Sequence, residues 1–297
     1  ATETLTFTTN QDWTVTPSED WVSVEPASGA AATEAINVTV TIAASTVEAE
    51  RTATILVKAG ELEETVTITQ GAYIVPEDGT EAYPYLIKTL EDLVAVRAKA
   101  SLETATYFRL ESDIDMTSVE NWVPFNWNDE YKRQIHFDGN NKTVNYAMRA
   151  DDDLNLVVEN CSVKDYLYGF LYANKSNDKI VVKNVTVENC AEYGAYLVAF
   201  NSASFENFTV KGQTKYGVVV ANAGARTVNF KNVSFEDAET PLHINELGTG
   251  KVTFKFSGIN DMSKAEFYTS EYVNVVAAAQ VGTKVCGSLQ DAVVAAN

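Results

Sequence analysis

Four segments of the chain repeat one pattern of residues, each about two dozen positions after the one before. Each segment contains an asparagine, and successive asparagines are 24, 23 and 25 residues apart. A period of this length fits one coil of a parallel β-solenoid and is short for a helical repeat. The four asparagines are Asn160, Asn184, Asn207 and Asn232.

Apolar residues stand at constant distances from these asparagines. Two positions upstream lie Val158, Val182, Phe205 and Phe230, and three positions downstream lie Val163, Val187, Val210 and Phe235. A single coil cannot cover its own apolar face, so each strand is expected to stack on its equivalent in the next coil. Weaker versions of the pattern on both sides predict six to eight coils, over about residues 107–276.

Two further columns follow each asparagine. A glycine after a tyrosine marks a turn that a Cβ atom would obstruct. An asparagine closes the following strand, where its amide is expected to bond along the stack. The first column is Tyr168-Gly169, Tyr193-Gly194 and Tyr216-Gly217, and the second is Asn174, Asn201, Asn222 and Asn245.

Helical spacing appears on either side of the coils. Residues 89–99 are expected to form a helix that begins after Thr89 and plugs the open end of the solenoid, since a bare sheet edge invites aggregation. Its apolar pattern is Leu90, Leu93, Val94 and Val96. Residues 288–296 begin with a sequence similar to the start of this helix. They are expected either to open a further solenoid in a longer chain or to cap the other end of this one.

Short alternating runs fill the first seventy or so residues. Ile36, Val38, Val40 and Ile42 would face one side of a strand, and turn signals separate six or seven such strands. The segment 1–73 is therefore expected to be an immunoglobulin-like β-sandwich. Trp13 and Trp21 alternate with valines, which favours the core over a sugar-stacking surface for both.

The same residues resemble a known family. Trp13-x-Val15, Trp21-Val22-x-Val24-x-Pro26-x-x-Gly29, Arg51-x-Ala53-x-Ile55 and the closing TVTITQGA are similar to the BACON domain over nearly all of residues 1–73. The resemblance implies a surface or secreted protein of a Bacteroidetes bacterium, in an extracellular or periplasmic setting. It further implies a lipid anchor of the outer-membrane lipoprotein kind, and a role in carbohydrate binding or as a spacer.

Residues 74–297 resemble the right-handed parallel β-helices of the pectin lyase-like group. YLIKTLEDL, YFRLESDIDM, NWVPF and FDGNNKTV look like the start of GLUG-repeat surface proteins of gut bacteria, most clearly over residues 83–144. This resemblance implies secretion and involvement with glycans or adhesion. The expected fold class is all-β, an N-terminal sandwich followed by a single-stranded right-handed parallel β-helix with a short capping helix.

Composition excludes several classes of partner. Lys and Arg total 22 against 41 Asp and Glu, and the net charge of −19 would repel nucleic acids. No window approaches 18 consecutive apolar residues, so no transmembrane segment is expected, and the N-terminus lacks the pattern of a signal peptide. The acidic excess predicts a solubilising coat, with attraction of calcium as the alternative. The oligomeric state stays open.

The three cysteines are Cys161, Cys190 and Cys286. They form no CxxC pair, which argues against zinc and redox chemistry. Cys161 and Cys190 lie inside the repeats, where free buried thiols are expected rather than a disulfide.

Candidate catalytic groups are scattered along the chain. His136, Asp138, Arg149, Arg226 and His243 fall in no motif of the lyases or hydrolases that use this fold. The run Asp151, Asp152 and Asp153 is a weak calcium candidate, because adjacent side chains point in different directions. We therefore expect no catalytic residue and no required cofactor, while enzymatic activity stays open.

A non-repetitive excursion, ENWVPFNWNDEYKRQ, interrupts the coils. Its aromatic rings offer flat faces to sugars, and its amides and carboxylates offer bonds to hydroxyls. Packing of the loop onto the solenoid is the alternative. The candidate glycan site is Trp122, Trp127, Asn128, Asp129 and Tyr131.

Three functions are compatible with these observations. The first is a non-catalytic cell-surface or secreted protein that binds a polysaccharide or host glycan, or acts in adhesion. The second is a β-helix polysaccharide lyase or glycoside hydrolase, and the third is a structural stalk within a larger surface protein.

Overall fold

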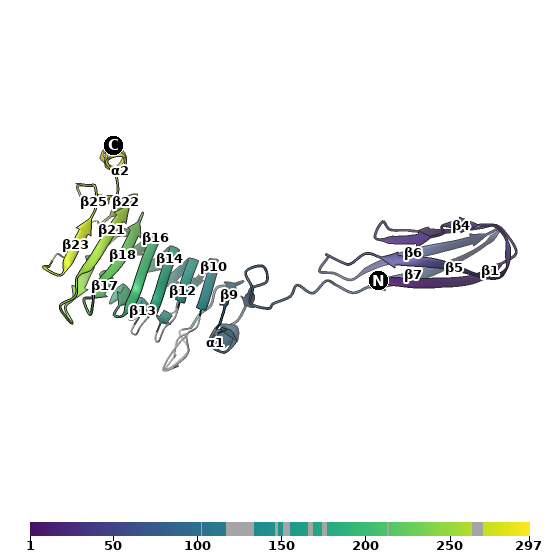
Figure 1. Cartoon of the computed structure of the whole chain (residues 1–297), viewed down its shortest axis with the longest axis horizontal. Helices are drawn as coiled ribbons and strands as arrows, with labels where there is room; N and C mark the ends of the chain where they lie inside the picture. The colour runs from purple at the N-terminus through teal and green to yellow at the C-terminus, as the bar shows by residue number, and fades with distance from the viewer. Residues whose placement is uncertain are drawn as a thin grey trace. The chain divides into compact units, whose positions relative to one another are not determined.

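A computed structural model of the chain describes residues 1–101, 103–116, 134–145, 148–150, 155–165, 169–173, 177–212, 214–262 and 270–297. The chain divides into two compact units, Ala1–Pro76 and Glu77–Asn297. Strands dominate both units (Figure 1). The described helices are α1 (Leu90–Lys99) and α2 (Leu289–Ala296), and both belong to the second unit.

Seven strands form the first unit, in two antiparallel sheets ordered β1-β5-β3 and β4-β2-β6-β7. They are β1 (Thr2–Thr9), β2 (Trp13–Pro17), β3 (Val22–Glu25), β4 (Ser28–Gly29), β5 (Ala32–Ile42), β6 (Arg51–Ala59) and β7 (Leu62–Gln70). The predicted alternation holds in β5, where Val38 and Val40 are buried between exposed neighbours. The predicted all-β sandwich is confirmed.

The two early tryptophans are part of this packing. The Trp13 side chain is 5% exposed and meets the Phe7 ring edge-on at 5.2 Å. Gly29 lies so close that an added Cβ would stand 2.6 Å from the Trp13 ring, which explains a glycine there. The Arg51 guanidinium lies 4.3 Å from the ring centre of half-buried Trp21. Neither ring is a free platform for a sugar.

The second unit is a parallel β-solenoid of about six turns. Its strands form a thirteen-stranded and a five-stranded sheet. The larger contains β8 (Tyr85–Ile87), β9 (Ala105–Leu110), β10 (Gln134–Val144), β12 (Asn155–Lys164), β14 (Asn177–Glu188), β16 (Phe200–Lys211), β18 (Arg226–Lys231), β19 (Ser234–Phe235), β21 (Val252–Ser257), β22 (Ile259–Asp261), β23 (Val273–Val276), β24 (Ala279–Val281) and β25 (Lys284–Cys286). The smaller contains β11 (Met148–Ala150), β13 (Gly169–Ala173), β15 (Tyr193–Leu197), β17 (Thr214–Ala221) and β20 (Ala238–Asn245).

Strand register follows the repeat of the sequence. Val158 pairs with Val182, and Phe205 continues that row in the next coil. The downstream column behaves in the same way, from Val163 through Val187 to Val210, and all of these side chains are fully or almost fully buried. Successive strands therefore lie side by side along the solenoid, as Figure 1 shows from β9 to β23. The predicted columns are confirmed, and only the β22–β25 and β24–β25 pairs in this unit are antiparallel among the described strands.

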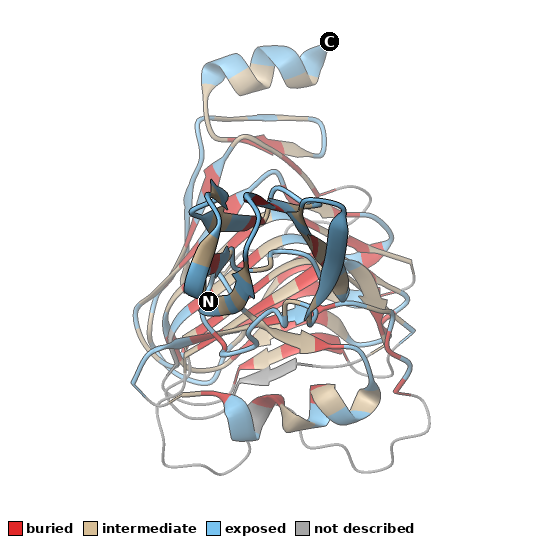
Figure 2. Cartoon of the chain, turned by 90° about the vertical axis from the view of Figure 1, so that its right-hand side faces the viewer, coloured by how far each residue is buried: buried red, intermediate tan, exposed pale blue. Residues whose placement is uncertain are grey.

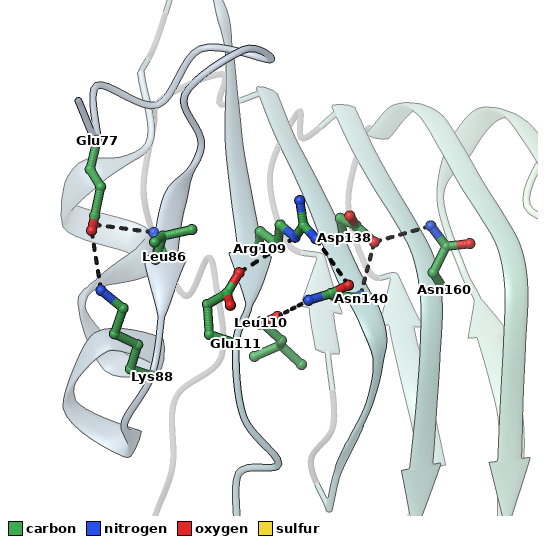
Figure 3. Close-up of polar contacts among 9 residues, drawn as sticks. All are labelled: Glu77, Leu86, Lys88, Arg109, Leu110, Glu111, Asp138, Asn140 and Asn160. Atoms are coloured by element: carbon green, nitrogen blue, oxygen red, sulfur yellow. Dashed lines mark hydrogen bonds and ion pairs between the residues drawn. The ribbon is translucent and has the colours of Figure 1, made fainter. Parts of the chain in front are cut away.

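The repeated asparagines form a ladder at one corner of the coils. All four adopt positive φ angles between 50° and 55°, a region that asparagine tolerates better than most residues. Each amide nitrogen donates to a side-chain oxygen one coil earlier, as from Asn184 to Asn160 at 2.8 Å and from Asn207 to Asn184 at 2.7 Å. Figure 3 shows the start of the ladder, where Asn160 donates to Asp138 at 3.0 Å.

The other two predicted columns differ in outcome. A Cβ on Gly194 would stand 2.5 Å from Val210 Cγ2, so the turn does exclude a side chain there. In the second asparagine column, Asn222 and Asn245 are one position out of register, because Ala221 rather than Asn222 stands opposite Asn245. The predicted bonding along the stack does occur at Asn222, whose side chain exchanges hydrogen bonds with the backbone of Gly248, 26 residues later. Asn174 lies outside the described residues.

Helix α1 covers the first coils as expected. Thr89 is its N-cap, and Asp92 completes a capping box. Leu93 and Val96 are buried in the solenoid core, whereas Val94 is 49% exposed. Helix α2 has the matching cap, Ser288, but buries no residue (Figure 2), so it does not close the other end in the way that α1 does.

All three cysteines are buried, and none of them is in a disulfide. Burial, followed by the negative charge of Asp138, raises the pKa of Cys161 to about 12. The expectation of buried thiols rather than a disulfide at Cys161 and Cys190 is confirmed.

Candidate binding face

The glycan site predicted from the sequence lies outside the described residues. This holds for Trp122, Trp127, Asn128, Asp129 and Tyr131, and also for the calcium candidates Asp151, Asp152 and Asp153. Ile114, just before this interval, bridges to Val144 of the next coil, and β11 of the five-stranded sheet follows Val144 directly.

The outward side of the five-stranded sheet carries a group of aromatic side chains that we call the tyrosine face. It consists of Tyr172 on β13, Tyr193 and Tyr196 on β15, Tyr216 on β17 and His243 on β20. All five are half-buried, whereas the inward residues of these strands are buried. Parallel pairing places Tyr172 beside Tyr196 and Tyr193 beside Tyr216.

The rings of the tyrosine face pack on one another. The Tyr172 and Tyr196 ring centres are 5.4 Å apart at 86°, and those of Tyr193 and Tyr196 are 5.6 Å apart at 73°. Edge-to-face packing of this kind is favourable for aromatic pairs. Val219 stands between Tyr196 and His243 in register and is only 3% exposed. Ring contacts thus join Tyr172, Tyr193 and Tyr196 on β13 and β15, and a further ring contact joins Tyr216 to His243 on β17 and β20.

Polar groups border this surface. Asn245 Nδ2 donates a hydrogen bond to the Tyr196 hydroxyl, and the Tyr216 ring stacks on His243 at 4.6 Å and 22°. Lys215 Nζ lies 5.0 Å from the Tyr216 ring centre. Burial, and next the positive charge of Lys215, lower the pKa of His243. The imidazole is therefore held in its neutral form near pH 7.

A cavity of about 610 Å³ opens at the corner where β17 and β20 begin. This volume is within the range of small-ligand pockets. Its lining residues come from three successive coils and are Ala191, Thr214, Lys215, Asp237 and Glu239.

The expected catalytic candidates do not converge in the described part of the chain. His136 Nε2 contacts Glu159 at 2.7 Å on the thirteen-stranded sheet, while Asp138 supports the asparagine ladder. The Arg226 guanidinium bonds to the neighbouring carbonyl of Ala225. Among the candidates whose side chains the structure describes, only His243 belongs to the tyrosine face; the backbone of Arg149 on β11 pairs with Tyr172. No three His, Cys, Asp or Glu side chains in the described ranges are grouped so as to hold a metal ion.

Two known family models match segments of the chain. Residues 11–71 match BACON, described as "Putative binding domain, N-terminal", and residues 131–218 match "Domain of unknown function (DUF4957)". The first unit is thus a BACON domain, a module typical of surface and secreted proteins of Bacteroidetes. No described helix has the length and apolar character needed to traverse a bilayer.

Solved structures and curated proteins add little. A GH5 xyloglucanase of Bacteroides ovatus, solved with a XXXG heptasaccharide, is 27% identical over 26% of this chain, with a TM-score of 0.23. The chain spans 16% of that enzyme's length. A "putative immunoglobulin A1 protease" of the same organism is 13% identical over 67% of this chain and 75% of its own, with a TM-score of 0.43. No curated protein matches the chain.

Proposed function

We propose that the protein is a non-catalytic, cell-surface glycan-binding protein in which the tyrosine face contacts the saccharide. The observation that carries this proposal is the run of aromatic rings over β13, β15 and β17, continued by His243 on β20. Flat, partly exposed rings pack well on the apolar faces of sugar rings, and their hydroxyls bond to the sugar's own. A lipid anchor at the cell surface belongs to the same proposal.

The geometry suits an extended chain better than a single small molecule. Neighbouring parallel strands lie about 4.8 Å apart, so a polysaccharide that runs across them would meet a new ring every one or two coils. The rings are held by packing and by the Asn245 hydrogen bond. A surface that is ordered before binding loses little entropy on binding.

Trp127 and its neighbours extend the proposal. We expect their side chains to add to the saccharide contacts of the tyrosine face. Binding of calcium by Asp151, Asp152 and Asp153 remains a prediction. Scattered His and acidic groups in the described ranges favour binding over a lyase or hydrolase.

A glycan array with the whole chain tests the proposal. Wild type should bind a defined set of glycans, and Tyr196→Ala should lose most of that signal. Tyr107→Ala serves as the matched control, because Tyr107 is a half-buried tyrosine on β9 of the other sheet. Trp127→Ala tests the excursion separately. Absence of binding to any glycan by wild type would contradict the function, and equal loss in Tyr107→Ala would contradict the site.

A further inference from the structure

Three charged residues line the cavity beside the tyrosine face, Lys215, Asp237 and Glu239, and the opposite charges of Lys215 and Glu239 do not meet. Lys215 and Glu239 occupy the same position on the neighbouring strands β17 and β20, between the register pairs Thr214–Ala238 and Tyr216–Thr240. Both side chains are exposed and both line the cavity. In the part of the chain that the structure describes, neither makes an ion pair, although exposed cross-strand charges of this kind often do.

Elsewhere on this solenoid, oppositely charged residues at neighbouring cross-strand positions do form ion pairs. Lys231 and Glu206 are also cross-strand neighbours, and their charged atoms are 2.7 Å apart. Lys164 and Glu188 form a similar pair at 3.3 Å. At the cavity, Lys215 instead lies against the Tyr216 ring. Its ammonium group and the Glu239 carboxylate are thus left on the wall of one open space.

An ammonium group only donates hydrogen bonds and an ionised carboxylate only accepts them. A ligand group that satisfies both must accept on one side and donate on the other, and a hydroxyl does so. A carboxylate or sulfate on the ligand would instead be repelled by Glu239, and an amine by Lys215. The adjoining Tyr216 ring supplies the apolar contact that a sugar ring needs.

We infer that this cavity seats one uncharged, hydroxyl-bearing sugar ring of the glycan, with Lys215 and Glu239 bonded to neighbouring hydroxyls. The inference rests on the proposed function and names its ligand class: a neutral polysaccharide rather than a polyuronate, a sulfated glycan or a polyamine sugar. The overall charge of −19 acts in the same direction, because it disfavours acidic glycans.

Calorimetric titration of the whole chain with a charge-graded panel tests this assignment. Cellohexaose, xylohexaose and mannohexaose are the neutral probes, hexagalacturonate is the anionic probe and hexaglucosamine is the cationic one. Wild type should bind at least one neutral probe more tightly than either charged probe. Lys215→Gln and Glu239→Gln should each weaken that binding roughly ten- to hundredfold, the usual cost of losing a hydrogen bond to a charged group.

The sign of the two effects decides between ligand classes. For a neutral ring both substitutions weaken binding. If Glu239→Gln tightened binding while Lys215→Gln weakened it, the site would be one for an anion, and the reverse pattern would indicate a cation; either result overturns the inference. Lys255→Gln on β21 and Glu64→Gln on β7 are charge-matched exposed controls that should leave the affinity unchanged.

The outcomes also separate this inference from the proposed function. If Tyr196→Ala abolished binding of a neutral probe while Lys215→Gln and Glu239→Gln left it unchanged, the function would stand and the cavity assignment would fail. Preference for hexagalacturonate or hexaglucosamine would have the same meaning. If no probe and no arrayed glycan bound wild type, the proposed function itself would fail.

Discussion

The Tyr196 hydroxyl accepts a hydrogen bond from Asn245, a residue 49 positions later in the chain. The bond spans two coils and joins β15 to β20 across the tyrosine face. It therefore couples the order of the aromatic surface to the stacking of the coils beneath it.

Tyr196→Phe should lower the free energy of unfolding by about 1 kcal/mol, because it removes this hydrogen bond and keeps the ring. Asn245→Ala should cost a similar amount, and the double variant should cost less than the sum. Chemical denaturation of the four proteins gives the coupling. Additive losses would show that the bond contributes nothing to stability.

The asparagine ladder predicts an unusual order of substitutions. Asn184→Ala removes two ladder hydrogen bonds and also places an alanine at a φ of 53°. Asn184→Gly removes the same bonds without the strain, which is about 1 kcal/mol or more for a residue with a Cβ. Denaturant midpoints should fall in the order wild type, Gly, Ala. A glycine variant less stable than the alanine variant would contradict the ladder's conformational role.

Thr214 is 2% exposed, and its hydroxyl makes no hydrogen bond with any described residue. A buried hydroxyl without a partner destabilises the folded state. Thr214→Val keeps the shape and the β-branch and should raise stability by about 1 kcal/mol in thermal or denaturant unfolding. A loss of stability would mean that the Thr214 hydroxyl does make a hydrogen bond in the folded protein.

His243 predicts a dependence of stability on pH. Its pKa is lowered in the folded protein from the ordinary 6.5, chiefly by burial. The unfolded chain then binds the proton more readily, so this contribution to stability is complete above about pH 6.5 and is lost as pH falls toward the lowered value. His243→Gln should flatten the slope of unfolding free energy between about pH 5 and 7 relative to wild type. Parallel curves would rule out a role for His243.

Much of this fold could be predicted from the sequence. The recurring asparagines, with apolar residues at fixed offsets, predicted the register of β12, β14 and β16, because each coil buries only what its neighbours match. Thr89 and the alternation in β5 were likewise readable from local chemistry.

The tyrosine face was not predicted, for a geometric reason. Tyr193 and Tyr196 are three residues apart, and simple alternation in a strand would place them on opposite faces. The buried pair between them, Gly194 and Ala195, changes the phase at the corner of the coil, so both rings face outward. The useful signal was tyrosine in register between coils, at positions 172 and 196 and at positions 193 and 216. In the sequence, Tyr193 and Tyr216 were interpreted only as residues that precede the glycine of a turn.

The central claim is that a glycan lies on the tyrosine face, and hydroxyl-radical footprinting of the whole chain tests it most directly. The probe is whichever neutral hexasaccharide binds most tightly, added at saturation. We predict reduced oxidation of Tyr172, Tyr193, Tyr196 and Tyr216, with no change at Tyr107. Unchanged oxidation of those four tyrosines, with protection confined to Trp21 or other residues of the BACON domain, would contradict the account.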